Sequence, residues 1–372
     1  MLSVVDLFCG AGGLSLGFQN AGFRVLLGND IEGQFGETFS ATHSGAKFLE
    51  GPVSELRGRR VLRETGLSRG ELNVLVGGPP CQGYSVYNHG RGSHDPRASL
   101  FRDYLAIVEG VLPEWLVMEN VVGLLSIDKG ALFETIKAEI IELGYTKVQA
   151  LILKAEEYGV PQERRRVVFV ANRLGIPISP PEKTHSKEAG FVSVWDAIGD
   201  LPPIYGGVRD PRAVPYAAEP SNPFQHRVRG NRTVVSDHIA PRLGPANQER
   251  VKHIPEGGSW RDIPVDLLPA GMRKAKRSDH TKRYGRPRKS DLACTILTKC
   301  DIHWGAFLHP IQNRPFSVRE AARLQSFPDS FEFKGSMTEK FVQVGNAVPP
   351  MLAEALANSI IKCRQENVRK AA

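Results

Sequence analysis

The feature that most constrains the fold is the alternation of short apolar runs with amphipathic stretches through residues 1–175. The apolar runs have the length of strands, and the stretches between them have helical spacing. We expect helices at 13–21, 99–112 and 130–145, and strands at 2–8, 24–30, 73–78, 115–121, 148–155 and 164–172. This alternation predicts an α/β fold with a doubly wound, mixed and mostly parallel sheet, in which ligands bind at the carboxyl ends of the strands.

Prolines interrupt the chain from about 176 to 290, and no regular period survives there. This composition predicts a smaller, irregular domain. Order returns with a strand-like run at 292–300, a helix at 317–327 and a closing helix at 349–365 that begins with proline. We therefore expect domains at 1–178 and 179–290, with 291–372 returning to the first domain.

Charge is concentrated in the irregular segment. Residues 205–290 hold 18 Lys and Arg against 8 Asp and Glu, a net charge of +10, whereas the whole chain carries +8. A near-neutral body joined to a basic segment is typical of a polyanion-binding module on a separate scaffold. The alternative is a basic surface that serves only solubility.

The five cysteines, at 9, 81, 294, 300 and 363, include no CxxC pair. Their odd number and wide spacing argue against a disulfide framework and against a zinc site, and we expect no metal. The N-terminus lacks the basic region of a signal peptide, and no apolar run reaches the roughly 18 residues of a membrane span. We therefore expect a cytoplasmic protein.

A glycine-rich loop, "DLFCGAGGLSLGF" at 6–18, joins the first expected strand to the first helix. Glycines without β-carbons let a ligand approach the backbone, as in nucleotide-binding loops. Asp30 ends the second strand, and a carboxylate there suits the two hydroxyls of a ribose. The pattern indicates an adenosine-type ligand, with a tight turn that binds nothing as the alternative.

Cys81 lies in "GGPPCQGYS" (77–85), directly after the third expected strand. Two prolines fix φ and remove amide donors, so the loop is stiff and aims the thiol at the mouth of the sheet. A reactive thiolate needs positive or hydrogen-bonding neighbours. The alternative is a buried structural cysteine.

Candidate neighbours lie at two other strand ends. Glu119 and Asn120, in "MENV", offer a carboxyl that can protonate and an amide that can orient, although such a pair also caps helices. Gln162, Arg164 and Arg166 alternate in "VPQERRRVVFVA" (160–171), so we expect them on one face of a strand, where two arginines suit phosphate or carbonyl binding. An exposed edge strand is the alternative. A further motif, "QVGNAVPP" (343–350), predicts a turn into the last helix.

Taken in order, these motifs resemble those of the DNA (cytosine-5) methyltransferases, especially the single-chain bacterial enzymes of restriction–modification systems. The resemblance covers roughly 1–175 and 290–365 and is carried by "FCGAGG", "GGPPCQGYS", "ENV", "YGVPQERRR", "RPFSVREAARLQSFPD" and "GNAVPP". It implies the Rossmann-like fold of S-adenosylmethionine-dependent methyltransferases. It also implies methyl transfer to C5 of a cytosine that flips out of duplex DNA.

The resemblance also implies residue roles. The Cys81 thiolate would add to C6, and C5 would then attack the methyl group of S-adenosylmethionine. Glu119 would hold or protonate N3, with Asn120 orienting it. Arg166 would contact the cytosine O2, Arg164 the neighbouring backbone, and Gln162 would fix the strand. The residues implied at the cofactor are Phe8, Gly10, Gly12, Gly13, Leu14, Asp30, Ile31, Pro80, Leu100, Asn346 and Val348.

The basic segment corresponds to the family's target-recognition region, which would hold the duplex through its phosphates. We expect DNA contacts from Gln82, Ser85, Arg261, Arg273, Lys274, Lys276 and Arg283. Two residues depart from the family pattern: Pro52 stands where an aspartate would contact the adenine amino group, and Tyr84 replaces the usual Phe. Glu50 is a candidate to compensate for Pro52; the alternative is a lower cofactor affinity.

The expected partners are a short specific site in duplex DNA and a restriction or defence-system nuclease that acts as a separate protein. We expect a monomer. Three other functions fit part of the sequence: a tRNA cytosine methyltransferase of similar fold, an inactive DNA-binding regulator and a nicotinamide dehydrogenase. The long basic segment opposes the first, intact Cys81, Glu119 and Arg166 oppose the second, and Cys81 with the basic segment opposes the third.

Overall fold

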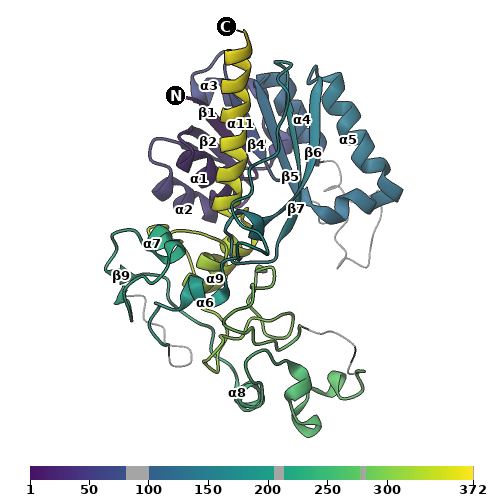
Figure 1. Ribbon diagram of the computed structural model, residues 1–372. Helices are drawn as coiled ribbons and strands as arrows, with labels where there is room; N and C mark the ends of the chain where they lie inside the picture. The colour runs from purple at the N-terminus through teal and green to yellow at the C-terminus, as the bar shows by residue number, and fades with distance from the viewer. Residues whose placement is uncertain (81–99, 205–212, 277, 279–281, 372) are drawn as a thin grey trace. The chain divides into compact units, whose positions relative to one another are not determined.

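The computed structural model describes residues 1–80, 100–204, 213–276, 278 and 282–371 (Figure 1). Its contacts divide the chain into two compact units. The first unit comprises Met1–Tyr158, Arg165–Thr184 and Ala347–Ala372, and the second comprises Gly159–Arg164 and His185–Asn346. The predicted second domain, 179–290, lies largely within the second unit, but that unit continues to Asn346 and includes the short segment Gly159–Arg164.

The first unit is built on a seven-stranded mixed sheet with the order β3-β2-β1-β4-β5-β7-β6. Neighbouring strands from β3 to β5 pair in parallel, whereas β7 is antiparallel to both β5 and β6. The strands are β1 (Ser3–Leu7), β2 (Arg24–Asp30), β3 (Lys47–Glu50), β4 (Val74–Gly77), β5 (Trp115–Val121), β6 (Lys147–Lys154) and β7 (Arg165–Asn172). The chain reverses its direction of winding between β1 and β4. In doubly wound sheets ligands bind at this point, beyond the carboxyl ends of the strands.

Helices cover both faces of this sheet, as the doubly wound prediction requires (Figure 1). They are α1 (Gly13–Asn20), α2 (Gln34–Thr42), α3 (Gly58–Thr65), α4 (Leu100–Val111), α5 (Ala131–Glu142) and α11 (Pro350–Ala371). The closing helix α11 packs along α1, so the end of the chain completes the layer that covers the first strand. No helix in the described part of the chain is long and apolar enough to cross a membrane.

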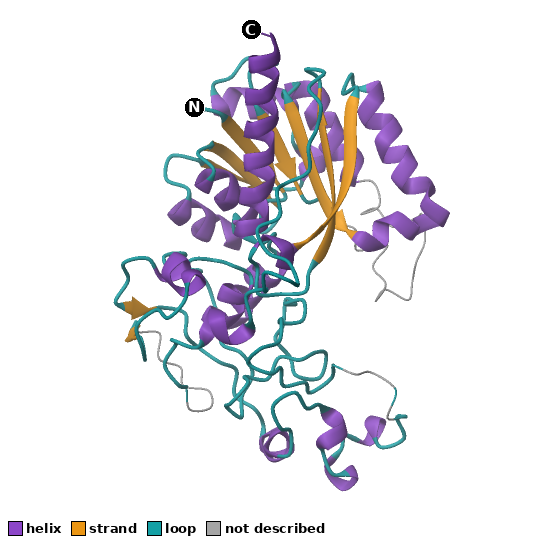
Figure 2. Cartoon of the chain, in the orientation of Figure 1, coloured by secondary structure: helices purple, strands orange, loops and turns teal. Residues whose placement is uncertain are grey.

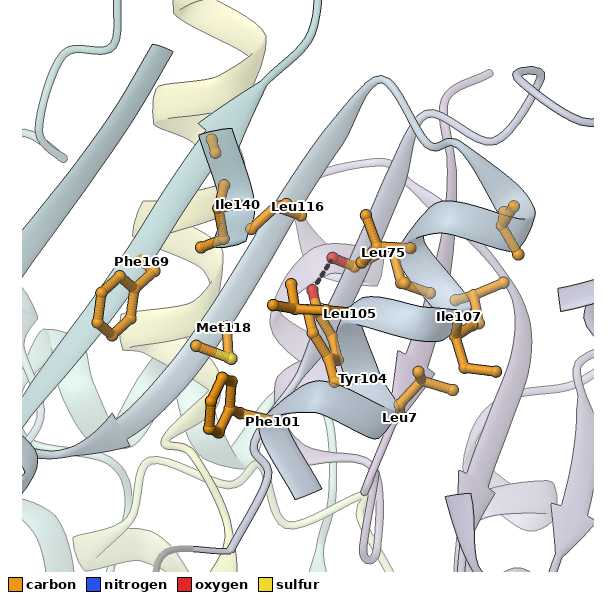
Figure 3. Close-up of a cluster of buried hydrophobic side chains, with 14 of the residues drawn as sticks. Leu7, Leu75, Phe101, Tyr104, Leu105, Ile107, Leu116, Met118, Ile140 and Phe169 are labelled. Atoms are coloured by element: carbon orange, nitrogen blue, oxygen red, sulfur yellow. Dashed lines mark hydrogen bonds between the residues drawn. The ribbon is translucent and has the colours of Figure 1, made fainter. Parts of the chain in front are cut away.

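Apolar side chains of α3, α4 and α5 form one core with the strands, part of which Figure 3 shows. At its centre Tyr104 of α4 is fully buried, and its hydroxyl donates to the carbonyl of Leu75 at 2.9 Å. A buried hydroxyl without such a partner would destabilise the core, so this bond lets an aromatic ring fill the space between helix and sheet.

The second unit has little regular structure and consists mostly of loops (Figure 2). Its short elements are α6 (Val194–Ile198), β8 (Val214–Pro215), α7 (Pro223–Arg229), β9 (Val234–Val235), α8 (Pro245–Lys252), α9 (Val318–Leu324) and α10 (Met337–Asn346). A separate apolar cluster around Trp260, Tyr284, Ile302 and Leu308 forms its core. This unit, mostly of loops, is compact and includes most of the proline-rich sequence.

Buried ion pairs join the segments of this second unit. Arg323 of α9 is fully buried and contacts the carboxylates of Asp200 and Asp329. Arg319 contacts Asp237 and Asp329, and Arg314 pairs with Glu320 at 2.7 Å. Buried charges are tolerated only when they are paired and hydrogen-bonded, so these contacts fix the path of chain segments that no sheet connects.

The structure differs from the sequence-based expectations at several points. Strand β3, which is short and amphipathic, was not predicted, and β7 begins at Arg165 rather than at 164. The run at 292–300 forms only an isolated bridge, between Ala293 and Gln162, instead of a strand. Helix α10 extends into the expected turn at 343–350 and ends at Asn346.

Candidate active site

Glu119 and Arg166 form an ion pair between neighbouring antiparallel strands. Arg166 of β7 lies opposite Val121 of β5, so it is diagonal to Glu119 on the same face of the sheet. Its Nε lies 2.6 Å from Oε1 of Glu119, and each side chain is 13% exposed. The structure therefore brings together two of the predicted catalytic residues, with the carboxyl and the guanidinium both partly open to solvent.

Asn120 and the residues before Cys81 support this pair. The buried Asn120 amide donates to the carbonyl of Pro79 at 3.0 Å, which ties the end of β5 to the loop after β4. A β-carbon at Gly78 would lie 3.3 Å from Oε2 of Glu119, so this glycine leaves the room that the carboxyl needs. Cys81, Gln82, Tyr84 and Ser85 lie outside the described residues.

Gln162 and Arg164 do not share a strand with Arg166, which corrects the prediction. Both precede β7 and belong to the second unit, where they are buried. Gln162 donates to the carbonyl of Leu324 and to the side chain of Gln325, and it accepts from the amide of Ile296. Arg164 donates to the carbonyls of Ile296 and Gly345. Through these hydrogen bonds, Gln162 and Arg164 hold segments of the second unit together.

The glycine-rich loop and Asp30 meet at the carboxyl ends of β1 and β2. The amide of Gly10 donates to Oδ2 of Asp30 at 2.8 Å, and the amide of Glu32 donates to Oδ1 at 3.0 Å. Burial raises the pKa of this carboxyl above its ordinary value. A carboxylate has about four acceptor positions, so Asp30 retains capacity for two ligand hydroxyls.

The surroundings of Asp30 also fit a nucleoside. Phe8 adopts a positive φ of 59°, which is strained for a residue other than glycine. Apart from its neighbours in the chain, no atom of the described residues lies within 4 Å of the position that a β-carbon on Gly10 would occupy. Ile31 is 64% exposed beside the carboxylate. An open backbone, an apolar side chain and a carboxylate are together the groups that an adenosine needs.

Asp6 is buried beneath the same loop. Its Oδ2 accepts from the amide and the hydroxyl of Ser15, while Oδ1 has no hydrogen-bond partner within the described structure. Burial raises the pKa of Asp6 to about 7, although the Ser15 hydrogen bonds act in the opposite direction. The first turn of α1 is thus tied to the end of β1 through one carboxyl.

His43 supports the glycine-rich loop from behind, a role that sequence reasoning missed. Its Nε2 lies 3.3 Å from the carbonyl oxygen of Gly12, and its Nδ1 lies 2.7 Å from the side chain of Gln19. A β-carbon on Gly12 would lie 2.5 Å from this ring, so the imidazole requires a glycine there. No local signal marks His43, because only the fold brings it beside a loop 31 residues earlier.

Pro52, the departure from the family pattern, precedes a short 3₁₀ turn at Val53–Glu55. The carboxylate of the neighbouring Glu50 lies against Gly33 at the start of α2, about 2.5 Å from where a β-carbon on Gly33 would stand. A carboxylate in this position interacts favourably with the helix dipole. The Glu50 carboxylate therefore lies beside the start of α2.

The other residues predicted at the cofactor are divided between the units. Gly13 and Leu14 begin α1, Leu100 begins α4, and Pro80 and Val348 lie in loops of the first unit. Asn346 ends α10 in the second unit and is exposed.

The predicted DNA-binding residues that the structure describes all lie in the second unit. Lys274 and Lys276 are exposed, as phosphate contacts would require. Arg273 donates to the carbonyls of Asp266 and Leu268, and Arg261 lies over the ring of Trp260. Arg283 lies over the ring of Trp304.

Comparison with known proteins gives a consistent result. The family profile described as "C-5 cytosine-specific DNA methylase" matches residues 2–362. The type II methyltransferase M.AgeI of Thalassovita gelatinovora is 33% identical, over 96% of this chain and 99% of its own length. The type II methyltransferase M1.HphI of Haemophilus parahaemolyticus is 34% identical, over 97% of this chain and 87% of its own length.

A solved structure supports the fold. A prophage-encoded Escherichia coli protein, assigned as a DNA modification methyltransferase, superposes with a TM-score of 0.79 at 24% identity. The superposition covers 98% of this chain and all of the other.

Proposed function

The chain belongs to the C-5 cytosine-specific DNA methylase family and is a DNA cytosine-5 methyltransferase, and we propose that it modifies a cytosine flipped out of a short site in duplex DNA through a transient bond between Cys81 and C6. Base flipping is required on physical grounds, because a thiol cannot reach C6 inside a stacked helix. The basic charge of residues 205–290 supports a duplex held through its phosphates.

S-adenosylmethionine, when bound, would supply the electrophilic methyl group. The open loop at Gly10, the carboxylate of Asp30 and the exposed Ile31 fit its adenosine part. In this assignment Asp30 would accept from the ribose hydroxyls, and Ile31 and Phe8 would lie against the adenine. The imidazole of His43 and the carboxyl of Asp6 hold the loop in shape through their hydrogen bonds to Gly12 and Ser15.

Two side chains of the protein, Cys81 and Glu119, act on the cytosine ring in this proposal. The Cys81 thiolate donates an electron pair to C6, and the ring electrons move towards N3, where Glu119 stabilises or protonates the nitrogen. C5 becomes nucleophilic and would take the methyl group from the bound donor, as the donor's sulfur–methyl bond breaks and S-adenosylhomocysteine is left. A base then removes the C5 proton, the bond from sulfur to C6 breaks, and aromaticity returns with the thiolate restored.

The Glu119–Arg166 ion pair is the observation that carries this assignment. Arg166 fixes the carboxyl beside the loop that leads to Cys81, and Asn120 ties that loop to β5 through Pro79. A guanidinium in this position also suits the O2 atom of a pyrimidine. Attack requires the reacting atoms within about 3–3.5 Å, so a fixed carboxyl and a stiff loop both serve positioning.

Bisulfite sequencing of DNA from bacteria that express the chain tests the reaction and the target together. We expect one short sequence motif with a protected cytosine, and methyl transfer to duplex DNA but not to tRNA from labelled cofactor. Transfer to tRNA alone would contradict the assignment. We further propose that the enzyme acts as a cytoplasmic monomer in restriction–modification or another anti-phage system, alongside a separate nuclease.

A further inference from the structure

Arg283 and Trp304 pair on the surface of the second unit. The guanidinium carbon of Arg283 lies 5.2 Å from the centroid of the Trp304 ring, which is within the range of a cation–π interaction. Trp304 is nevertheless 64% exposed. A large indole that is mostly in water and carries a guanidinium on its ring offers a partner a flat surface that is both apolar and cationic.

The backbone beneath this pair is rigid. Tyr284 is fully buried, its amide donates to the carbonyl of Ile302, and its hydroxyl donates to Asn247. The carbonyl of Arg283 itself accepts from the amide of Trp260. The amide of Gly285 donates to the carbonyl of Gly305, next to Trp304. Both side chains therefore project from two segments whose positions relative to each other are fixed within the unit.

The donors of Arg283 are unused, in contrast to those of a close neighbour. Arg286 is buried and donates to the carbonyls of Val251, Ile254 and His309, so it serves the fold. The guanidinium of Arg283 forms no hydrogen bond or ion pair with any described residue, and its contact is with the indole. Stacking on a ring fixes the guanidinium plane and leaves its N–H edges free.

This arrangement matches one ligand group in duplex DNA. Guanine presents O6 and N7 side by side in the major groove, and arginine recognises them through two parallel hydrogen bonds. We propose that Arg283 reads a guanine of the recognition site and that Trp304 is a positioning residue that holds the guanidinium for this contact. The inference rests on the proposed function, because it requires a sequence-specific DNA substrate.

The test measures discrimination between DNA sequences. Once bisulfite sequencing has identified the site, kcat/KM is measured on duplexes that carry the site or a single base-pair replacement of it. For Arg283→Ala we expect a loss of discrimination of about tenfold to a hundredfold at one G·C pair and not at the others. Arg283→Lys should lose much of it as well, since an ammonium lacks the planar fork of two parallel N–H groups that matches O6 and N7.

The role of Trp304 has its own readout. Trp304→Ala should lose several-fold of the discrimination at the same base pair, and Trp304→Phe should restore it, because phenylalanine retains a ring face for the guanidinium. Ile311→Ala, which removes another exposed apolar side chain of the second unit, and Arg242→Ala, which removes another exposed arginine, are the matched controls. Neither control should alter the preference at that pair.

Three results would overturn the inference: unchanged discrimination in Arg283→Ala, an equal loss on every duplex, which indicates a phosphate contact, or a loss confined to an A·T pair. Thermal unfolding checks that each variant is folded. If Arg283→Ala does not fold, the discrimination measured for Arg283→Lys tests the inference in its place. A wild-type chain that methylates no DNA would contradict the proposed function instead. A specific wild-type enzyme whose Arg283 variants are equally specific contradicts this inference alone.

Discussion

Nε of Arg166 lies 2.6 Å from Oε1 of Glu119, across two antiparallel strands and beside the loop that leads to Cys81. This pair joins the end of β5, which runs parallel to β4, to β7, which runs antiparallel to β5. The carboxyl that is proposed to stabilise N3 is thus oriented by a guanidinium that is itself suited to a pyrimidine oxygen.

Replacement of Glu119 tests the proton step. Glu119→Gln keeps the size of the side chain but removes the acid, so kcat should fall by about 10²- to 10⁴-fold while DNA affinity stays within a few-fold. Single-turnover methyl transfer and a binding titration measure the two quantities. Glu142→Gln, an exposed position at the end of α5, is the control and should behave like wild type. Undiminished turnover in Glu119→Gln would remove the carboxyl from the mechanism.

Pro52 provides a test of the cofactor site. Since the Glu50 carboxylate lies beside Gly33 at the start of α2, we expect no side-chain carboxylate at the adenine amino group. Pro52→Asp should tighten binding of S-adenosylhomocysteine by about tenfold, as expected for a hydrogen bond to a charged group. Calorimetry measures this affinity without turnover. Pro52→Ala separates the loss of the proline from the gain of the carboxylate, and equal affinities in all three proteins would show that the adenine does not lie there.

His43 predicts how stability depends on pH. Burial lowers its pKa from 6.5 to about 4, so the folded state disfavours the protonated ring. Its contribution is complete above pH 6.5 and is lost as the pH falls towards 4, with a limit of about 3 kcal/mol. His43→Gln should therefore flatten part of the acid-induced fall in the free energy of unfolding.

Thermal unfolding between pH 4 and 7 measures that slope. Burial also lowers the pKa of His309, in the second unit, to about 4. Because His309 is unchanged in His43→Gln, part of the pH dependence should persist in that variant. His226→Gln, at an exposed position, serves as the control. An identical slope in wild type and His43→Gln would mean that His43 is not held neutral behind the loop.

The buried ion pairs of the second unit predict a large stability effect. Arg323→Met leaves Asp200 and Asp329 buried without their main partner, and the second unit should lose about 3–5 kcal/mol of folding free energy. Urea unfolding followed by tryptophan fluorescence measures it, because Trp195, Trp260 and Trp304 all lie in this unit. Lys252→Met breaks the exposed pair with Glu249 and should leave the midpoint nearly unchanged. Similar midpoints in both variants would contradict a structural role for the buried pairs.

The sheet could be predicted because its central strands are apolar runs of strand length. β1, β2, β4 and β5 lie within a residue or two of their expected bounds, and their loops carry the glycine and carboxyl motifs. β3 was missed because Phe48 and Leu49 alone provide its apolar signal. The antiparallel pairing that brings Arg166 beside Glu119 depends on the order of strands in space, which local patterns do not contain.

The second unit shows why pattern reasoning fails outside sheets and helices. The run at 292–300 has the composition of a strand, and at Ala293 it pairs with the backbone around Gln162, but at Ile296 side chains supply the partners. The amide of Ile296 donates to Gln162, and its carbonyl accepts from Arg164. At Ile296, the side chains of Gln162 and Arg164, which were expected at the catalytic site, thus make the hydrogen bonds that a neighbouring strand would otherwise make. No periodicity in sequence encodes such long-range side-chain to backbone contacts.

The central claim is that Cys81 forms a transient bond with the cytosine ring, and Cys81→Ser should abolish turnover while leaving DNA binding largely intact. The most direct measurement uses duplex DNA with 5-fluorocytosine at the target position, incubated with S-adenosylmethionine and analysed by denaturing electrophoresis and mass spectrometry. Because fluorine cannot leave as the proton does, we expect a stable covalent complex attached through Cys81 and no such complex with Cys81→Ser. Complete absence of the adduct from the active wild-type enzyme would contradict the account.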